Sequence, residues 1–101
     1  IDEEIAYIAV NSRWFAFTLL VKKYQHLITT EILELVVKQH IKIPSYCNNL
    51  SENLCIEIIK INPNTFQYFS HQTYDMCEIA VNLLPEARLW IKSNELRQAF
   101  Q

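Results

Sequence analysis

The chain has 101 residues and contains no glycine, only three prolines and only three cysteines. Phosphate-binding loops, dinucleotide-binding fingerprints and two-residue hairpin turns need positive φ angles or close backbone approach to a ligand, which glycine provides. The absence of glycine therefore excludes P-loop, Rossmann and kinase-type nucleotide sites. A helical chain tolerates this absence best, and a chain of this length that is 50% hydrophobic can bury one core without disulfide or metal cross-links.

Clustered positive charge is also missing, because nine Lys and Arg are scattered among 11 Asp and Glu for a formal net charge of -2. Nucleic-acid binding depends on such clusters, so no nucleic-acid partner is expected. The longest uncharged apolar stretch, residues 14–21, is far shorter than the span of about 20 residues that crosses a membrane, so no membrane partner is expected either. The chain begins with Ile1 and acidic residues, which is unlike a signal peptide and favours a fragment of a longer protein.

The cysteines are odd in number and form no Cys-x-x-Cys pair, which is not typical of a secreted disulfide framework. They are Cys47, Cys55 and Cys77. We expect reduced, buried thiols in a cytoplasmic protein.

Enzymatic chemistry finds little support in the sequence. The cysteines, with His71 and His40, match no known zinc-ligand spacing. Cys47 with a histidine and Asn48 could form a nucleophilic trio, but Cys47 occupies an apolar repeat position without a nearby basic residue. We therefore expect no catalytic residue, no metal, no cofactor and no enzyme activity.

An internal repeat of 22 residues organises the chain, and its first unit carries five extra residues. The units cover residues 1–27, 28–49, 50–71 and 72–93, and residues 94–101 form a helical extension or cap. The second position of every unit holds a residue whose side-chain oxygen can cap a helix start: Asp2, Thr29, Ser51 and Thr73. Apolar residues at the fifth, sixth, ninth and tenth positions then place one stripe on a first helix of about three turns, and we expect it to face the core.

A second helix is predicted in each unit. Pro63 and Pro85 fit the first turn of such a helix, with Asn62 as a cap and Ser12 as the corresponding cap in the first unit. Pro44 predicts a late, short or distorted second helix, whereas the inserted residues 21–27 predict a long one in the first unit. A bulky residue at position 19 is expected to fit between neighbouring hairpins: Leu19, Tyr46, Tyr68 and Trp90.

Two short helices cannot bury their apolar stripe alone, so the units must stack. The sequence predicts an all-α fold of stacked helical hairpins, either an α-solenoid-like repeat domain or a small helical bundle, as a single domain over residues 1–101. Apolar side chains at an uncovered end of the stack would favour a homo-oligomer.

The clearest examples of the repeat are ENLCIEIIK (52–60) and YDMCEIAVN (74–82). They resemble short tandem two-helix repeats of unknown function that occur in proteins of giant viruses and intracellular bacteria. The resemblance covers residues 28–93, and residues 1–27 more loosely. Size and composition also resemble small helical antagonists with which intracellular bacteria restrain their effector enzymes. Both resemblances imply an interaction role.

Aromatic residues crowd the first unit, where Trp14, Phe15 and Phe17 would span most of a helix circumference. Some of them should therefore contact a partner. We interpret the chain as a protein–protein interaction module that binds a protein partner through an apolar-aromatic surface. An extension of this interpretation is that binding inhibits the partner. The alternative is a structural domain that self-associates within a larger viral or bacterial protein. The candidate partner-binding residues are Trp14, Phe17, Tyr24, Lys22, Lys23, Arg88, Trp90 and Phe100.

Overall fold

The computed structural model describes residues 2–47 and 49–101, and over these ranges the chain contains helices and no strand. The α-helices are α1 (Glu3–Ser12), α2 (Ala16–Lys23), α3 (Thr30–Gln39), α4 (Glu52–Ile61), α5 (Tyr74–Leu83) and α6 (Asn94–Ala99). The 3₁₀ helices are η1 (Gln25–Leu27), η2 (Ile43–Tyr46), η3 (Pro63–Tyr68) and η4 (Pro85–Trp90). The predicted all-α fold is confirmed.

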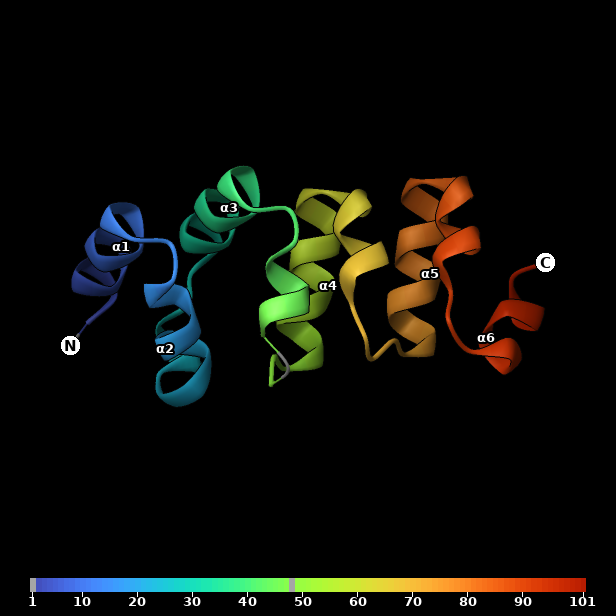
Figure 1. The fold of residues 1–101 in the computed structure, drawn as a ribbon, viewed down its shortest axis with the longest axis horizontal. Helices are drawn as coiled ribbons and strands as arrows, with labels where there is room; N and C mark the ends of the chain where they lie inside the picture. The colour runs from blue at the N-terminus through green and yellow to red at the C-terminus, as the bar shows by residue number, and fades with distance from the viewer. Residues whose placement is uncertain (1, 48) are drawn as a thin grey trace.

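The helices form an elongated stack of 44 × 21 × 17 Å, with the two termini at opposite ends (Figure 1). The first helices of the four units form one layer, in which α1 packs on α3, α3 on α4, and α4 on α5. In the second layer, η2 packs on η3 and η3 on η4, while each of η3 and η4 also contacts the first helix of its own unit. Each first helix thus packs against the first helix of at least one neighbouring unit.

The four predicted caps begin the four first helices. The Asp2 carboxylate accepts a hydrogen bond from the Ile5 N–H at 2.9 Å. The hydroxyls of the other three caps each accept from the N–H three residues on, at 3.3 Å: Thr29, Ser51 and Thr73. Each cap satisfies a backbone donor that lacks a partner within the helix, which typically contributes about 1 kcal/mol. Ser93 caps α6 in the same way at 3.4 Å.

The second helices differ in type from the first. In the last three units they are 3₁₀ helices, which suits segments of four to six residues that begin at or next to proline. Asn62 caps η3 as predicted, by accepting from the Asn64 N–H at 3.0 Å, and η2 is shorter than η3 and η4 as Pro44 predicts. The first unit has the long second helix expected, α2 followed by η1. The prediction for Ser12 is wrong, because Ser12 is the last residue of α1 and α2 begins without a side-chain cap.

The core runs along the whole stack between the two layers. Its largest fully buried side chains include Phe17, Phe66, Ile32, Ile58 and Met76. Two predictions about packing are wrong. Ile5, from the first apolar stripe, is 53% exposed, and the position-19 residues Leu19 and Tyr46 are exposed because α2 and η2 leave a hollow of about 360 Å³ between them.

Two glutamine side chains form paired hydrogen bonds with a backbone segment that precedes a helix. Gln72 donates from Nε2 to the Trp90 carbonyl at 3.1 Å and accepts at Oε1 from the Lys92 N–H at 2.9 Å. Gln25 makes the same pattern with the Asn49 carbonyl at 2.6 Å and the Ser51 N–H at 3.4 Å. Each amide therefore pairs with backbone groups two residues apart, as a neighbouring strand would. These clamps fix the loop that leads into the next helix.

Candidate interaction surface

Aromatic rings gather along one edge of the stack, where the first and second units change from their first to their second helix. The Trp14 ring lies 4.2 Å from the His40 ring and 5.8 Å from the Tyr46 ring, centroid to centroid. Phe15 meets Trp14 edge-to-face at 6.3 Å, and the Arg13 guanidinium lies 6.0 Å from the Phe15 ring centroid. We call these five residues the aromatic edge.

Local backbone structure positions the rings. Arg13 ends α1 with an extended conformation and donates its N–H to the Ala9 carbonyl at 2.9 Å, so Trp14 and Phe15 fall in the turn before α2. In the next unit, His40 ends α3 by donating its N–H to the Val36 carbonyl at 2.8 Å. Because α1 packs on α3, the two chain reversals lie at the same edge.

The aromatic edge combines two half-buried rings with two exposed ones. Trp14 and His40 are half-buried, and Trp14 packs against the core. Phe15 is 53% exposed and Tyr46 is 57% exposed. Rings that are held by stacking and still reach solvent lose little conformational entropy when a partner covers them. This surface is therefore suited to binding through aromatic contacts.

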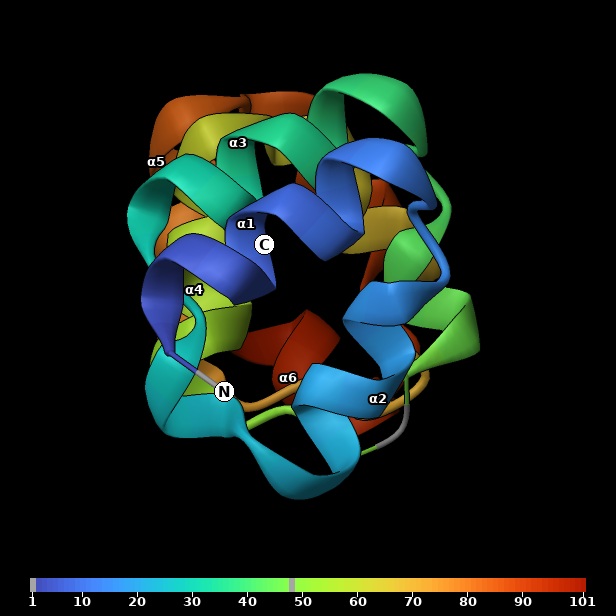
Figure 2. The same ribbon diagram turned by 90° about the vertical axis from the view of Figure 1, so that its left-hand side faces the viewer.

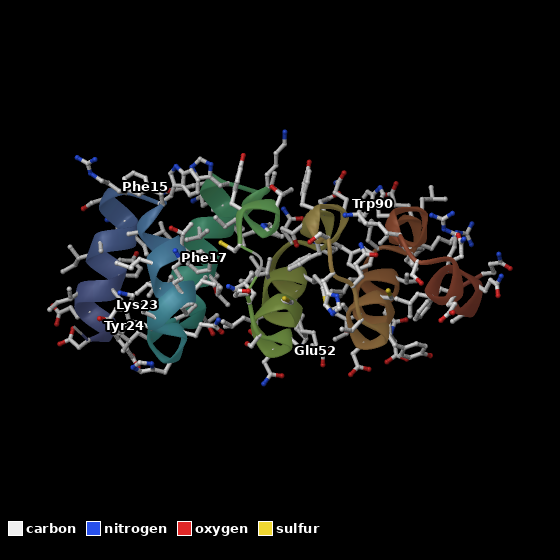
Figure 3. The ribbon with its side chains drawn as sticks, turned by 60° about the horizontal axis from the view of Figure 1, so that its bottom comes forward. Phe15, Phe17, Lys23, Tyr24, Glu52 and Trp90 are labelled. Atoms are coloured by element: carbon white, nitrogen blue, oxygen red, sulfur yellow. The ribbon has the colours of Figure 1, made fainter. Side chains whose placement is uncertain are left out.

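The residues predicted to bind a partner do not form one surface. The sequence suggested that Trp14, Phe17 and Tyr24 share one helix. Trp14 instead lies in the turn before α2, as part of the aromatic edge. Figure 3 shows Phe15 at one edge, Lys23 and Tyr24 near the opposite edge, and Trp90 in the other half of the stack. Lys22 and Lys23 are exposed in the last turn of α2, and the Tyr24 ring is half-buried.

Phe17 is wrong as a partner-binding candidate because its side chain is fully buried. It lies on the inner side of α2, where it joins Leu20 and Val21 in the core (Figure 3). The dense aromatic run of the sequence is thus divided between the core and the surface by the turn before α2. Arg13, Phe15, His40 and Tyr46 were not among the predicted surface residues. Tyr46 had a signal in the sequence, since it is the bulky position 19 of the one unit whose second helix is shortened by Pro44.

The remaining candidates lie at the C-terminal end. Arg88 is exposed, and Trp90 and Phe100 are half-buried. Arg88, Phe100 and Arg97 line a hollow of about 340 Å³ with Leu89 and Gln101. The Arg97 guanidinium donates to the Ile91 carbonyl at 2.6 Å and 3.2 Å, so its charge helps to fix α6 in place.

Two of the three cysteines lie in one hollow. Cys47 and Cys55 line a hollow of about 270 Å³ together with Glu52 and His71. Burial raises the pKa of both thiols from 9.0 to about 11, and the Glu52 charge adds to the effect on the pKa of Cys55. Both thiols are therefore protonated at neutral pH, whereas nucleophiles and metal ligands need the thiolate.

The remaining residues considered as metal ligands or catalytic groups are His40, Cys77 and Asn48. The His40 ring stacks on Trp14, Cys77 is fully buried with its pKa raised by desolvation, and Asn48 lies outside the described residues. Among residues 2–47 and 49–101, no three His, Cys, Asp or Glu side chains converge as ligands of a metal ion.

Comparison of the chain with known protein families, characterised proteins and solved structures finds no match. In the described part of the chain, no helix has both the length and the apolar character that crossing a membrane requires. The aromatic edge must therefore be interpreted from its own geometry.

Proposed function

We propose that the chain is a protein-interaction module that binds a protein partner through the aromatic edge. The observation that carries this proposal is the exposure of Phe15 and Tyr46 on either side of Trp14, a ring anchored in the core. Interface hot spots are enriched in Trp, Tyr and Arg that sit beside supporting contacts. The aromatic edge supplies all three residue types within one cluster.

Charge around the edge favours recognition of a protein over other ligands. Arg13 is the cation of the cluster, and its guanidinium lies near the Phe15 ring, where cation–π attraction holds it over an apolar surface. Such an arginine can pair with a carboxylate of the partner while the rings bury apolar side chains. We therefore expect a partner segment that carries apolar side chains next to an acidic residue.

The test starts by replacing Phe15 with a photo-crosslinking phenylalanine analogue, which captures the partner in extract of the producing cells. Titration calorimetry with the purified partner then compares the parent with a variant carrying Phe15→Ser and Tyr46→Ser. Loss of two exposed rings should raise Kd about tenfold or more. Trp14 is left intact because its ring also packs against the core.

The matched control is Leu83→Ser, which removes a similarly exposed apolar side chain from α5. Its Kd should equal that of the parent. Equal affinity of the Phe15→Ser, Tyr46→Ser variant and the parent would contradict the proposal. Crosslinking only to further copies of the chain would instead support the alternative, a self-associating assembly domain.

A further inference from the structure

The outer side of α1 is a second exposed apolar surface, separate from the aromatic edge. Ile5 is 53% exposed and Ile8 is 56% exposed, and Ala9 on the same side of the helix is partly exposed. In the view onto the N-terminal end, α1 lies in front, and no other described element covers it (Figure 2). We call these three residues the α1 end face.

The repeat shows what this face does in the other units. The residues equivalent to Ile5 are Ile32, Leu54 and Met76, those equivalent to Ile8 are Leu35, Glu57 and Ile79, and those equivalent to Ala9 are Val36, Ile58 and Ala80. At the first position, Ile32 and Met76 are buried and Leu54 is half-buried. The second position is half-buried in all three units and the third is buried in all three.

The side of the helix that receives the preceding unit follows from this comparison. Ala6 and Val10, on the inner side of α1, are as buried as their equivalents, so α1 loses burial only at the end face. In α5, the last of the four first helices, Met76 and Ala80 stay buried and Ile79 stays half-buried, whereas Val81 on the opposite side becomes half-buried. Among the described residues, α1 has no helix before it, and α5 is followed by the short α6 and not by the first helix of another unit. The end face is therefore the side that contacts the preceding unit.

We propose that the α1 end face binds one further two-helix repeat of the same 22-residue design, stacked ahead of α1. The occupant would present a capped helix with apolar residues at its sixth and tenth positions, as α1 presents Ala6 and Val10 to α3. The proposed contact continues the interface already repeated between α1 and α3, α3 and α4, and α4 and α5.

A second copy of the chain fits this face less well. To stack head to tail, it would have to offer the outer side of its α5. That side is partly covered by its own α6, because the Phe100 ring lies 5.1 Å from the Tyr74 ring and Leu96 packs against the core. The side of α5 that corresponds to the inner side of α1 is thus already partly covered by α6.

The test adds a repeat in register. Residues 50–72 are placed before Asp2 in place of Ile1, which sets the added Ser51 cap 22 residues ahead of Asp2, the spacing of the native caps Ser51 and Thr73. Ile5→Ser with Ile8→Ser is then introduced into both the parent and the extended protein. In the parent, the two substitutions should leave the thermal midpoint nearly unchanged. In the extended protein they should lower the thermal midpoint by about 5 °C or more, because only there are the two side chains buried.

Leu89→Ser is the control, because Leu89 is 72% exposed in η4 at the other end and should have the same small effect in both proteins. A second extension, residues 28–50 before Asp2, keeps the same cap spacing and repeats the comparison. The proposal would be overturned if Ile5→Ser with Ile8→Ser changed the thermal midpoint equally in the parent and in each of the two extended proteins. It would also be overturned if light scattering of the parent showed a dimer that Ile5→Ser with Ile8→Ser dissociates, since the face would then bind a second copy.

Discussion

The two ends of the stack differ in what covers their outermost first helix. At the N-terminal end, Ile5 of α1 is 53% exposed, whereas its equivalent in α5, Met76, is 1% exposed beneath α4. At the C-terminal end, the outer side of α5 is partly covered by α6, through Phe100 against Tyr74. Large apolar residues in the same repeat position thus have different environments, which shows that burial in a stack depends on the neighbouring unit.

The C-terminal cover is a modified continuation of the repeat. Ser93 begins α6 with the same cap hydrogen bond as the four units, but 20 residues after Thr73 instead of 22. The early start brings a short helix back over the end, and Arg97 then fixes it to the Ile91 carbonyl. This segment thus differs from the first helices of the units both in the position of its cap and in its length of 6 residues.

Removal of residues 94–101 should have the largest effect, because it opens the covered end. The loss of half-buried Leu96 and Phe100 and of the charged hydrogen bond from Arg97 should lower the free energy of unfolding by roughly 4 kcal/mol. Urea unfolding followed by circular dichroism measures this change, and light scattering should show new self-association through the uncovered α5.

The comparison variant for this truncation is Ile5→Ser with Ile8→Ser, which alters the open end. It should change the free energy of unfolding by about 0.5 kcal/mol or less, as expected for exposed sites. Similar losses from both changes would mean that the two ends are equally covered in solution.

Alkaline pH should weaken the middle of the stack by the next largest amount. The pKa of Cys47 and of Cys55 is about 11 in the folded chain against an ordinary 9.0, so the folded state favours the protonated thiol. This contribution is fully present below pH 9 and is lost as the pH rises from 9 through 11. By pH 10 the loss should be about 1 kcal/mol for each thiol.

Two single-tryptophan variants, Trp14→Phe and Trp90→Phe, report the alkaline effect separately at the two ends. Urea midpoints at pH 8 and pH 10 should fall together for both, since the two cysteines lie between the ends in one continuous core. A protein carrying Cys47→Ala and Cys55→Ala should show a smaller difference between the two pH values. An unchanged difference would mean that other groups cause the alkaline loss.

A smaller effect is expected from the loss of either glutamine clamp, one of which lies in each half of the stack. Gln72→Leu and Gln25→Leu should each cost about 1 kcal/mol, because each leaves backbone groups without their partner. Hydrogen exchange should quicken at the Lys92 amide in the first variant and at the Ser51 amide in the second. The Lys92 effect should be larger, since its hydrogen bond is 2.9 Å long and that of Ser51 is 3.4 Å. A uniform change along the chain would contradict a local role for the clamps.

The aromatic edge shows how far a site could be predicted from this sequence. Both Trp14 and Phe17 were predicted to contact a partner, but Phe17 is fully buried in the core, whereas Trp14 is half-buried. His40 and Tyr46 join the site from the next unit, and their contacts with Trp14 depend on how α3 stacks beside α1. Repeat spacing defines which residues are equivalent, whereas it does not give the angle at which one unit meets the next.

The sequence by itself determined the helical class, the four capped first helices and the proline-led second helices, because caps and prolines act on the backbone within a few residues. Tertiary structure alone decided the glutamine clamps and the division of the aromatics between core and edge. It also decided that Ile5 and Ile8 are exposed while their equivalents are covered. These features depend on side-by-side contacts between units, and such contacts are set by packing over distances that local sequence does not encode.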